Sequence, residues 1–195
     1  MAVELNFEKF YELLYAASKS AFTSVQRAHA SESFYVFALY TTGDLAYVIP
    51  TSSTEEGLTL TAQKYSTIKH YQDFGIDQLR EHLRWSPCDS LLHTEGEEYF
   101  VEVNNFISNV PLILDAIPTE ESWAEFDDFY SKFLGVCINV LQRLDTESVF
   151  GEGTKRNSVV LNILMGDQSD SERLKFANLL NPSSVYDHFE QVYHA

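Results

Sequence analysis

The sequence predicts an α+β fold in which a small, mainly antiparallel sheet is packed with about six to seven helices. Stretches rich in β-branched and aromatic residues form a hairpin pattern at 34–52 and a separate strand pattern at 158–165. Most of the remaining chain places apolar residues three and four positions apart, which is typical of amphipathic helices. The strand patterns do not alternate regularly with the helical ones, so we expect helices packed on one small sheet. The chain has no internal repeat and no linker-like segment, which predicts a single domain over 1–195.

The first third of the chain predicts one helix followed by the hairpin. A helix is expected over 7–28, with Asn6 as its N-cap. The two strands of the hairpin are expected at 34–41 and 46–51, on either side of a Thr-Gly-Asp turn. Pro50 falls late in the second strand, which suits a sheet edge or a strand end.

Capping boxes, in which Ser or Thr precedes an acid by three positions, mark the start of four further helices. They predict helices from Ser53 to about Tyr71, from Thr94 to about Asn109, from Ser169 to about Leu180 and from Ser184 to about Tyr193. A short helix is expected at 76–83. The segment 83–92 could supply a further strand.

The longest predicted helix begins at Thr119, with two glutamates at its positive dipole end. Its apolar stripe keeps spacings of three and four throughout. The stripe consists of Trp123, Phe126, Tyr130, Phe133, Leu134, Cys137, Val140, Leu141 and Leu144. The glycine-containing segment 151–157 is expected to be a loop. The pattern at 158–165 is apolar at nearly every position, which predicts a central strand buried on both faces.

No motif in the chain predicts a catalytic residue, a cofactor or a metal site. The segment 151–155 superficially resembles a phosphate loop, but its lysine follows a threonine and the chain then runs into a strand. The six histidines have no spacing that brings metal ligands together on one continuous helix. Nucleophile motifs such as GxSxG are absent. Cys88 and Cys137 belong to no CxxC pair, so we expect two reduced, mostly buried thiols.

Two short constellations are candidates for contact with a partner or ligand. The first contains Arg84, Trp85 and Asp89, and arginine and tryptophan are common anchors of interfaces. The alternative is that Trp85 fills the core while Arg84 pairs with an internal acid such as Asp89. The second is Asp167, which follows the buried strand at a position that often lines a site. A turn followed by a helix cap at Ser169 explains that position equally well.

The acidic charge of the chain is concentrated in one segment. The formal net charge of −16 argues against nucleic acid and anionic membrane surfaces as direct ligands, because it repels phosphate groups. Residues 85–131 carry eleven acids and no lysine or arginine. Within the longest predicted helix, Glu121, Glu125 and Asp128 fall on one face, opposite the apolar stripe. That face is either a solvated surface that maintains solubility or a docking surface for a basic partner.

Four segments carry a family resemblance, and they are FYVFALYTTGD at 34–44, TEEGL at 54–58, LRWSPCD at 83–89 and GDQSDSERLKFANLLNP at 166–182. Together they resemble an uncharacterised bacterial family of domains of unknown function. Their spacing covers nearly the whole chain, so the resemblance implies one full-length domain. It implies no catalytic residues, because the family has no established activity. Some small acidic bacterial families of this kind resemble immunity proteins encoded beside toxins.

The expected location of the protein is the cytoplasm. The start of the chain lacks the basic region and the apolar run of a signal peptide. The longest apolar stretches are too short and too interrupted to span a bilayer. Two reduced thiols are in keeping with a reducing compartment.

Three functional hypotheses follow from these observations. The leading one is a non-enzymatic acidic binding protein, as an immunity-type inhibitor of a basic toxin such as a nuclease. The second is an enzyme of unknown reaction with a site near Arg84, Asp89 and Asp167, which requires these residues to converge in one pocket. The third is a structural subunit or a homo-oligomer joined through an aromatic surface.

Overall fold

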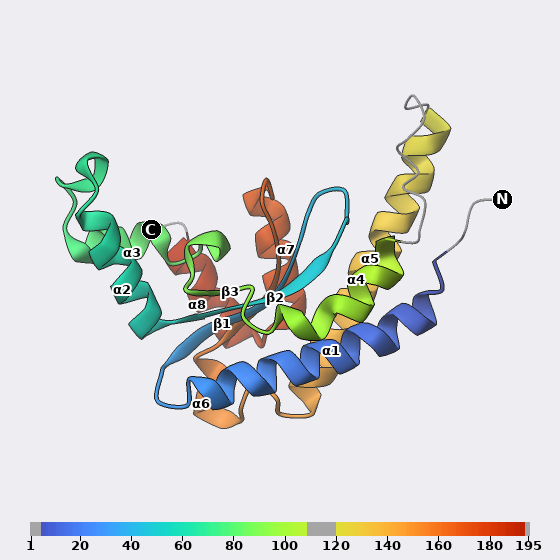
Figure 1. The fold of residues 1–195 in the computed structure, drawn as a ribbon, viewed down its shortest axis with the longest axis horizontal. Helices are drawn as coiled ribbons and strands as arrows, with labels where there is room; N and C mark the ends of the chain where they lie inside the picture. Colours follow the sequence, from blue (N-terminus) through green and yellow to red (C-terminus); the bar gives the residue numbers. More distant parts are fainter. Residues whose placement is uncertain (1–4, 109–119, 194–195) are drawn as a thin grey trace.

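A computed structural model describes residues 5–108 and 120–193, and Figure 1 shows its fold. The helices of this part are α1 (Phe7–Ala28), α2 (Glu55–Ser66), α3 (Ile76–Leu83), α4 (Val101–Ser108), α5 (Glu120–Thr146), α6 (Gly153–Asn157), α7 (Asp170–Leu180) and α8 (Ser183–Tyr193). Short 3₁₀ helices lie at Lys69–Tyr71, Pro87–Asp89 and Glu97–Phe100. The strands are β1 (Phe34–Thr41), β2 (Val48–Thr54), β3 (Leu92–His93) and β4 (Val160–Met165). No described helix is both long and apolar enough to cross a membrane.

The four strands form one mixed sheet in the order β3-β2-β1-β4, which confirms the α+β class. β2 pairs antiparallel with β1 and with β3, as the hairpin pattern predicts. β4 pairs parallel with β1, so the sheet is not purely antiparallel. The eight helices in the described part exceed the expected six to seven because the short α6 lies in a segment expected to be a loop.

The strand expected at the centre of the sheet, β4, lies instead at its edge. All six of its residues are buried because helices cover both faces and α7 packs along the open edge. Side chains satisfy the backbone groups that a neighbouring strand would otherwise bind. The amide of Asn181 exchanges two hydrogen bonds of 2.8 Å with the Leu161 backbone, and Gln168 Nε2 donates to the Ile163 carbonyl at 2.9 Å. The apolar pattern therefore predicted the burial of β4 correctly, but β4 is an edge strand covered by side chains and helices and not a central strand.

Alternate residues of β1 and β4 enter two separate cores, as the two-residue period of a strand requires. Phe37 and Leu39 join a core built with α1, α4 and α5, whereas Val36 and Ala38 join a second core built with α2 and α8. In Figure 1, α1 runs along the lower side of the sheet, while α2, α3 and α8 lie toward the left of the view. The sheet is thus enclosed between two helical layers.

The start of α1 follows the local capping chemistry, whereas the starts of α2 and α8 differ from the prediction. α8 begins at Ser183, so its expected cap Ser184 lies inside the helix. The Asn6 side chain accepts the Lys9 backbone N–H at 3.0 Å, so α1 occupies the expected residues. The cap of α2 is Thr54, the last residue of β2, whose hydroxyl accepts the Gly57 N–H at 3.1 Å, and not Ser53. The helix also ends at Ser66, before the predicted end.

The segment between α3 and α4 departs most from the expected helices and strands. Thr94 has a left-handed φ of 71° and forms a turn, so the 3₁₀ helix at 97–100 and then α4 replace one continuous helix. Of the residues 83–92, which could have formed a strand, only Leu92 joins the sheet. The contacts that this segment makes with β2 through β3 override its short local signals.

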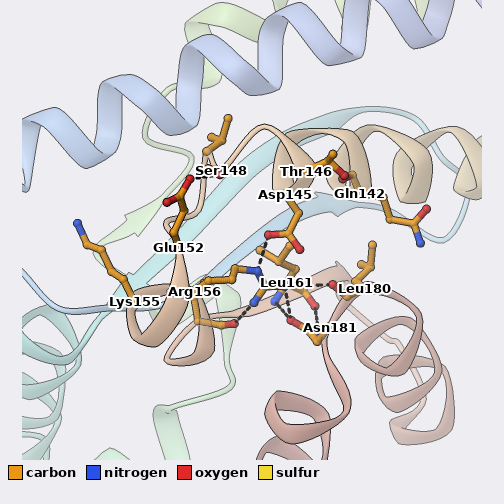
Figure 2. Close-up of polar contacts among 12 residues, drawn as sticks. Gln142, Asp145, Thr146, Ser148, Glu152, Lys155, Arg156, Leu161, Leu180 and Asn181 are labelled. Carbon is orange, nitrogen blue, oxygen red and sulfur yellow. Dashed lines mark hydrogen bonds and ion pairs between the residues drawn. The ribbon is translucent and has the colours of Figure 1, made fainter.

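The segment 151–157 was expected to be a loop, but it contains α6 and a buried arginine. Arg156 is 7% exposed, and Figure 2 shows its guanidinium between the ends of three elements. Its Nε donates to Asp145 at the end of α5, and its Nη1 donates to the Val159 carbonyl before β4. Its Nη2 donates to the Leu180 carbonyl and to Asn181, both at 3.2 Å, at the end of α7. One side chain therefore joins α5, β4 and α7.

Candidate functional site

The parallel strands β1 and β4 end side by side, with Thr41 opposite Met165. Two hollows adjoin at this carboxyl end of the pair, and both are lined by Met165 and Gly166. Residues just past the ends of parallel strands commonly form ligand sites in α/β proteins. We call the hollow around Asp167 and Glu172 the acidic hollow, and the hollow around Arg173 the Arg173 hollow.

The acidic hollow has a volume of about 410 Å³ and presents hydrogen-bond acceptors. Asp167 and Glu172 lie on its wall, and none of the described lining residues is Lys, Arg or His. The Gln168 side chain uses its Nε2 to hold β4, while its Oε1 is buried and has no partner among the described residues. Two phenols, of Tyr40 and Tyr130, complete the lining. This composition favours a cationic group that donates hydrogen bonds.

Both phenols of the acidic hollow are protonated at neutral pH, as an ordinary tyrosine is, and burial raises their pKa values further. It raises the pKa of Tyr40 to about 12, with the Cys88 thiol as the next cause, and the Cys88 Sγ lies 3.8 Å from the Tyr40 Oη. Burial also raises the pKa of Tyr130, and the Glu172 carboxylate adds to that shift. The Tyr130 hydroxyl donates to the Met165 sulfur at 3.4 Å. The hollow therefore carries negative charge only on its two carboxylates.

An exposed tryptophan leads to this hollow along α5. Trp123 was expected in the core stripe, but it is 49% exposed, because the first turns of α5 extend past the sheet in Figure 1 and the stripe is fully buried only from Phe133 onward. The rings of Trp123 and Phe126 lie 6.4 Å apart, and those of Phe126 and Tyr130 lie 5.9 Å apart. These three residues form what we call the aromatic ladder, which ends at Tyr130 in the acidic hollow.

Exposed acids flank the aromatic ladder. Glu125 and Asp127 are exposed and form no ion pair with a described residue. Asp128 is also exposed and pairs with Lys132 at 2.6 Å, one turn later on the same helix. The side chain of Glu121 lies outside the part that the structure describes. The described acids at the start of this helix thus face solvent, as the sequence pattern predicts for Glu125 and Asp128.

The other described acids of 85–131 divide into exposed and internal groups. Glu97, Glu98 and Glu102 are exposed near the start of α4. Glu95 instead pairs with His29, with 3.0 Å between its Oε1 and the His29 Nε2. Asp89 accepts hydrogen bonds inside the fold, as described next. The acidic segment is therefore surface over most, but not all, of its described length.

Arg84, Trp85 and Asp89 face different neighbours. The Arg84 guanidinium donates two hydrogen bonds of 2.8 and 2.7 Å to the Glu55 carboxylate, so its acid partner is not Asp89. Asp89 accepts hydrogen bonds from the hydroxyls of Tyr65 and Ser86. Asp167 lines the acidic hollow, whose described lining includes neither Arg84 nor Asp89. The convergence required by the enzyme hypothesis is not seen among these residues.

Trp85 and Cys88 line the Arg173 hollow, which has a volume of about 390 Å³. Trp85 packs edge-on against Phe189, with 4.7 Å between the ring centroids. Of the two cysteines, Cys137 is buried as expected, whereas Cys88 is exposed, because its 3₁₀ turn lies at the rim of this hollow. No group of three or more His, Cys, Asp and Glu residues within 5–108 and 120–193 is arranged to hold a metal ion.

Several lining residues were missed by sequence reasoning. Tyr40 could not be placed near Asp167, because the parallel pairing of β1 with β4 joins segments more than 100 residues apart. Gln168 and Glu172 read as parts of a turn and a capping box, and the box is indeed formed at Ser169. The available signal was the Gly-Asp dipeptide after the strand, and both of its residues line the acidic hollow.

One comparison identifies a family. The family model described as "Domain of unknown function (DUF4303)" matches residues 14–182. The comparisons with curated proteins and with solved structures gave no match. The chain therefore belongs to the uncharacterised DUF4303 family of domains of unknown function.

Proposed function

We propose that this protein is a non-enzymatic binding protein whose partner is a basic protein. One observation carries the proposal: the acidic hollow, with two carboxylates and no described cation on its wall, continues along the aromatic ladder to an exposed tryptophan among exposed acids. In the specific form of this proposal, the protein is a cytoplasmic, immunity-type inhibitor of a basic toxin. Two cysteines without a disulfide support a reducing compartment.

Each part of this surface has a distinct role in binding. The net charge of −16 attracts a basic partner over long range and raises its association rate. Trp123 offers apolar area of the kind that anchors interfaces once it is covered. The acidic hollow accepts one lysine or arginine side chain of the partner, between Asp167 and Glu172 and against the phenol rings.

The test is affinity capture from cells of the source organism at low salt, with the full chain as bait. The face variant Glu125→Gln/Asp127→Asn/Asp167→Asn removes three exposed charges that make no ion pair with a described residue. Wild-type bait should retain a protein of net positive charge, identified by mass spectrometry, and the face variant should lose it. With the purified partner, the dissociation constant should rise steeply with salt.

A matched control separates local charge from total charge. The variant Glu12→Gln/Asp73→Asn/Asp187→Asn removes the same number of exposed acids from α1, the α2–α3 connection and α8. It should retain the partner as the wild type does. The proposal fails if the face variant binds as well as this control, or if no basic protein distinguishes the two.

The immunity role has its own readout once a partner is known. The partner gene is induced in a heterologous host, alone and together with this chain. The partner alone should stop growth, co-expression of the wild type should restore growth, and co-expression of the face variant should not. A partner that is harmless on its own would leave a basic-protein binder but exclude the immunity role.

A further inference from the structure

We propose that the Arg173 hollow binds a small carboxylate ligand with a planar, aromatic body. This inference does not rest on the proposed function, since it concerns the neighbouring hollow and the opposite charge. The cavity of about 390 Å³ lies within the size range of small-molecule sites. Two of the four segments that carry the family resemblance, 83–89 and 166–182, meet on its wall.

Arg173 is the group that recognises the carboxylate. Its Nη1 donates to the Trp85 carbonyl at 3.3 Å, whereas its Nε is buried and has no hydrogen-bond partner among the described residues. It also forms no ion pair with any described acid, in a chain with 29 acidic residues. The guanidinium on the wall of the hollow thus has no carboxylate partner among the described residues, and a ligand carboxylate would supply one.

The walls of the hollow are aromatic and held in place. Trp85 packs edge-on against both Phe189 and Tyr35, with centroid distances of 4.7 and 5.8 Å. The Tyr193 hydroxyl donates to Asp170 at 2.7 Å, and the Arg173 guanidinium lies 5.5 Å from the Tyr193 ring. Rings fixed before binding lose little freedom when a flat ligand enters beside them.

The remaining titratable groups on the wall limit the charge of the ligand. Glu81, His82 and Cys88 line the same hollow as Arg173. The Glu81 carboxylate offsets part of the attraction of the single guanidinium. The cost of removing water from an ion rises more steeply with its charge than that attraction does, so the hollow favours a monocarboxylate over a dianion such as phosphate. The site therefore fits an aromatic monocarboxylate better than a phosphate ester.

Fluorescence of Trp85 provides the test. The chain has two tryptophans, so the variant Trp123→Phe leaves Trp85 as the only indole, on the wall of the hollow. Benzoate is titrated at constant ionic strength, and benzamide serves as the neutral isostere. Benzoate should change the emission in a saturable way, and benzamide should bind about tenfold more weakly or not at all.

Variants on α7 assign the effect to Arg173. In the Trp123→Phe background, Arg173→Met should weaken benzoate binding about tenfold or more, and Arg173→Lys should weaken it less. Lys175→Met removes an exposed cation from the same helix and should leave binding unchanged. Circular dichroism checks that each variant is folded, and the benzoate–benzamide comparison needs no Arg173 variant. Equal binding of the two ligands, or unchanged binding by a folded Arg173→Met, would overturn the proposal.

Discussion

Replacing Arg156 by methionine should be among the most destabilising single changes in the chain. Methionine retains much of the apolar stem but removes the four hydrogen bonds that the guanidinium donates, shown in Figure 2. The Arg156 side chain is 8% exposed, and that of its ion-pair partner Asp145 is 26% exposed. The variant leaves this carboxylate, the Val159 carbonyl and the Leu180 carbonyl without the donor that joins them.

The size of the effect follows from which groups lose a partner. Removing one member of a buried ion pair typically destabilises a protein by about 3–5 kcal/mol. Solvent reaches Asp145 and reduces the cost of leaving its carboxylate unpaired. The two backbone carbonyls each lose a hydrogen bond from a charged donor, and such a bond contributes about 1.5–3 kcal/mol. We therefore expect a loss of about 3–5 kcal/mol in the free energy of unfolding. For a domain of this length that corresponds to a fall in Tm of roughly 6–20 °C.

Urea unfolding followed by circular dichroism measures the effect. The midpoint should fall for Arg156→Met while the slope of free energy against urea stays constant. Asp145→Asn should cost less than Arg156→Met, and the double variant should cost less than the sum of the two, because the pair is shared. Lys155→Met, an exposed neighbour on α6, should change stability by at most about 0.5 kcal/mol. A cost below about 1 kcal/mol for Arg156→Met would refute the assignment of this network as structural.

Further measurements test other parts of the fold. In the native protein a thiol reagent should modify the exposed Cys88 but not the buried Cys137, because burial raises the pKa of the Cys137 thiol. Both thiols should react after unfolding, and two reactive thiols in the native state would contradict the described burial. Hydrogen bonds to two glutamates raise the pKa of His29 in the folded state. Its contribution to stability should therefore be complete below about pH 6.5 and disappear as the pH rises through the folded-state pKa. The variant His29→Asn should flatten that part of the profile of unfolding free energy against pH, measured in urea. A Cβ at Gly166 would approach the Tyr40 hydroxyl to 3.2 Å, so Gly166→Val should lower unfolding stability by about 1–3 kcal/mol and also weaken benzoate binding.

The elements that sequence reasoning located well are those whose signals are local. The bounds of α1 and α3 agree with the prediction, and the capping box at Ser169 forms as expected. Caps and helical periodicity depend on residues within one or two turns, so they can be read without knowledge of the fold. The hairpin is equally local, because a short turn joins its strands.

What sequence reasoning missed depends on contacts between distant segments. The pairing of β1 with β4 and the coverage of the β4 edge by Asn181 both required the tertiary fold. Arg156 read as a loop residue, because a charged residue shortly after two glycines gives no local sign of a buried role. Trp123 keeps the periodicity of the stripe, but it lies near the start of α5, and the first turns of this helix extend past the sheet in Figure 1. The candidate site was located only by one of its edges, Asp167, for the same reason.

The shared wall of the two hollows implies that their ligands, if both proposals hold, affect each other. Arg173 is a positive charge beside a hollow proposed to receive a basic side chain, and it therefore opposes that binding. A carboxylate ligand neutralises the guanidinium and should strengthen binding of the basic partner by a few-fold, and linkage requires the partner to strengthen carboxylate binding by the same factor. Measuring the partner's dissociation constant with and without saturating benzoate tests the sign, with the Arg173→Met variant as the control that should already show the higher affinity. Weaker partner binding in benzoate would mean that the two ligands compete for Met165 and Gly166 rather than cooperate through charge.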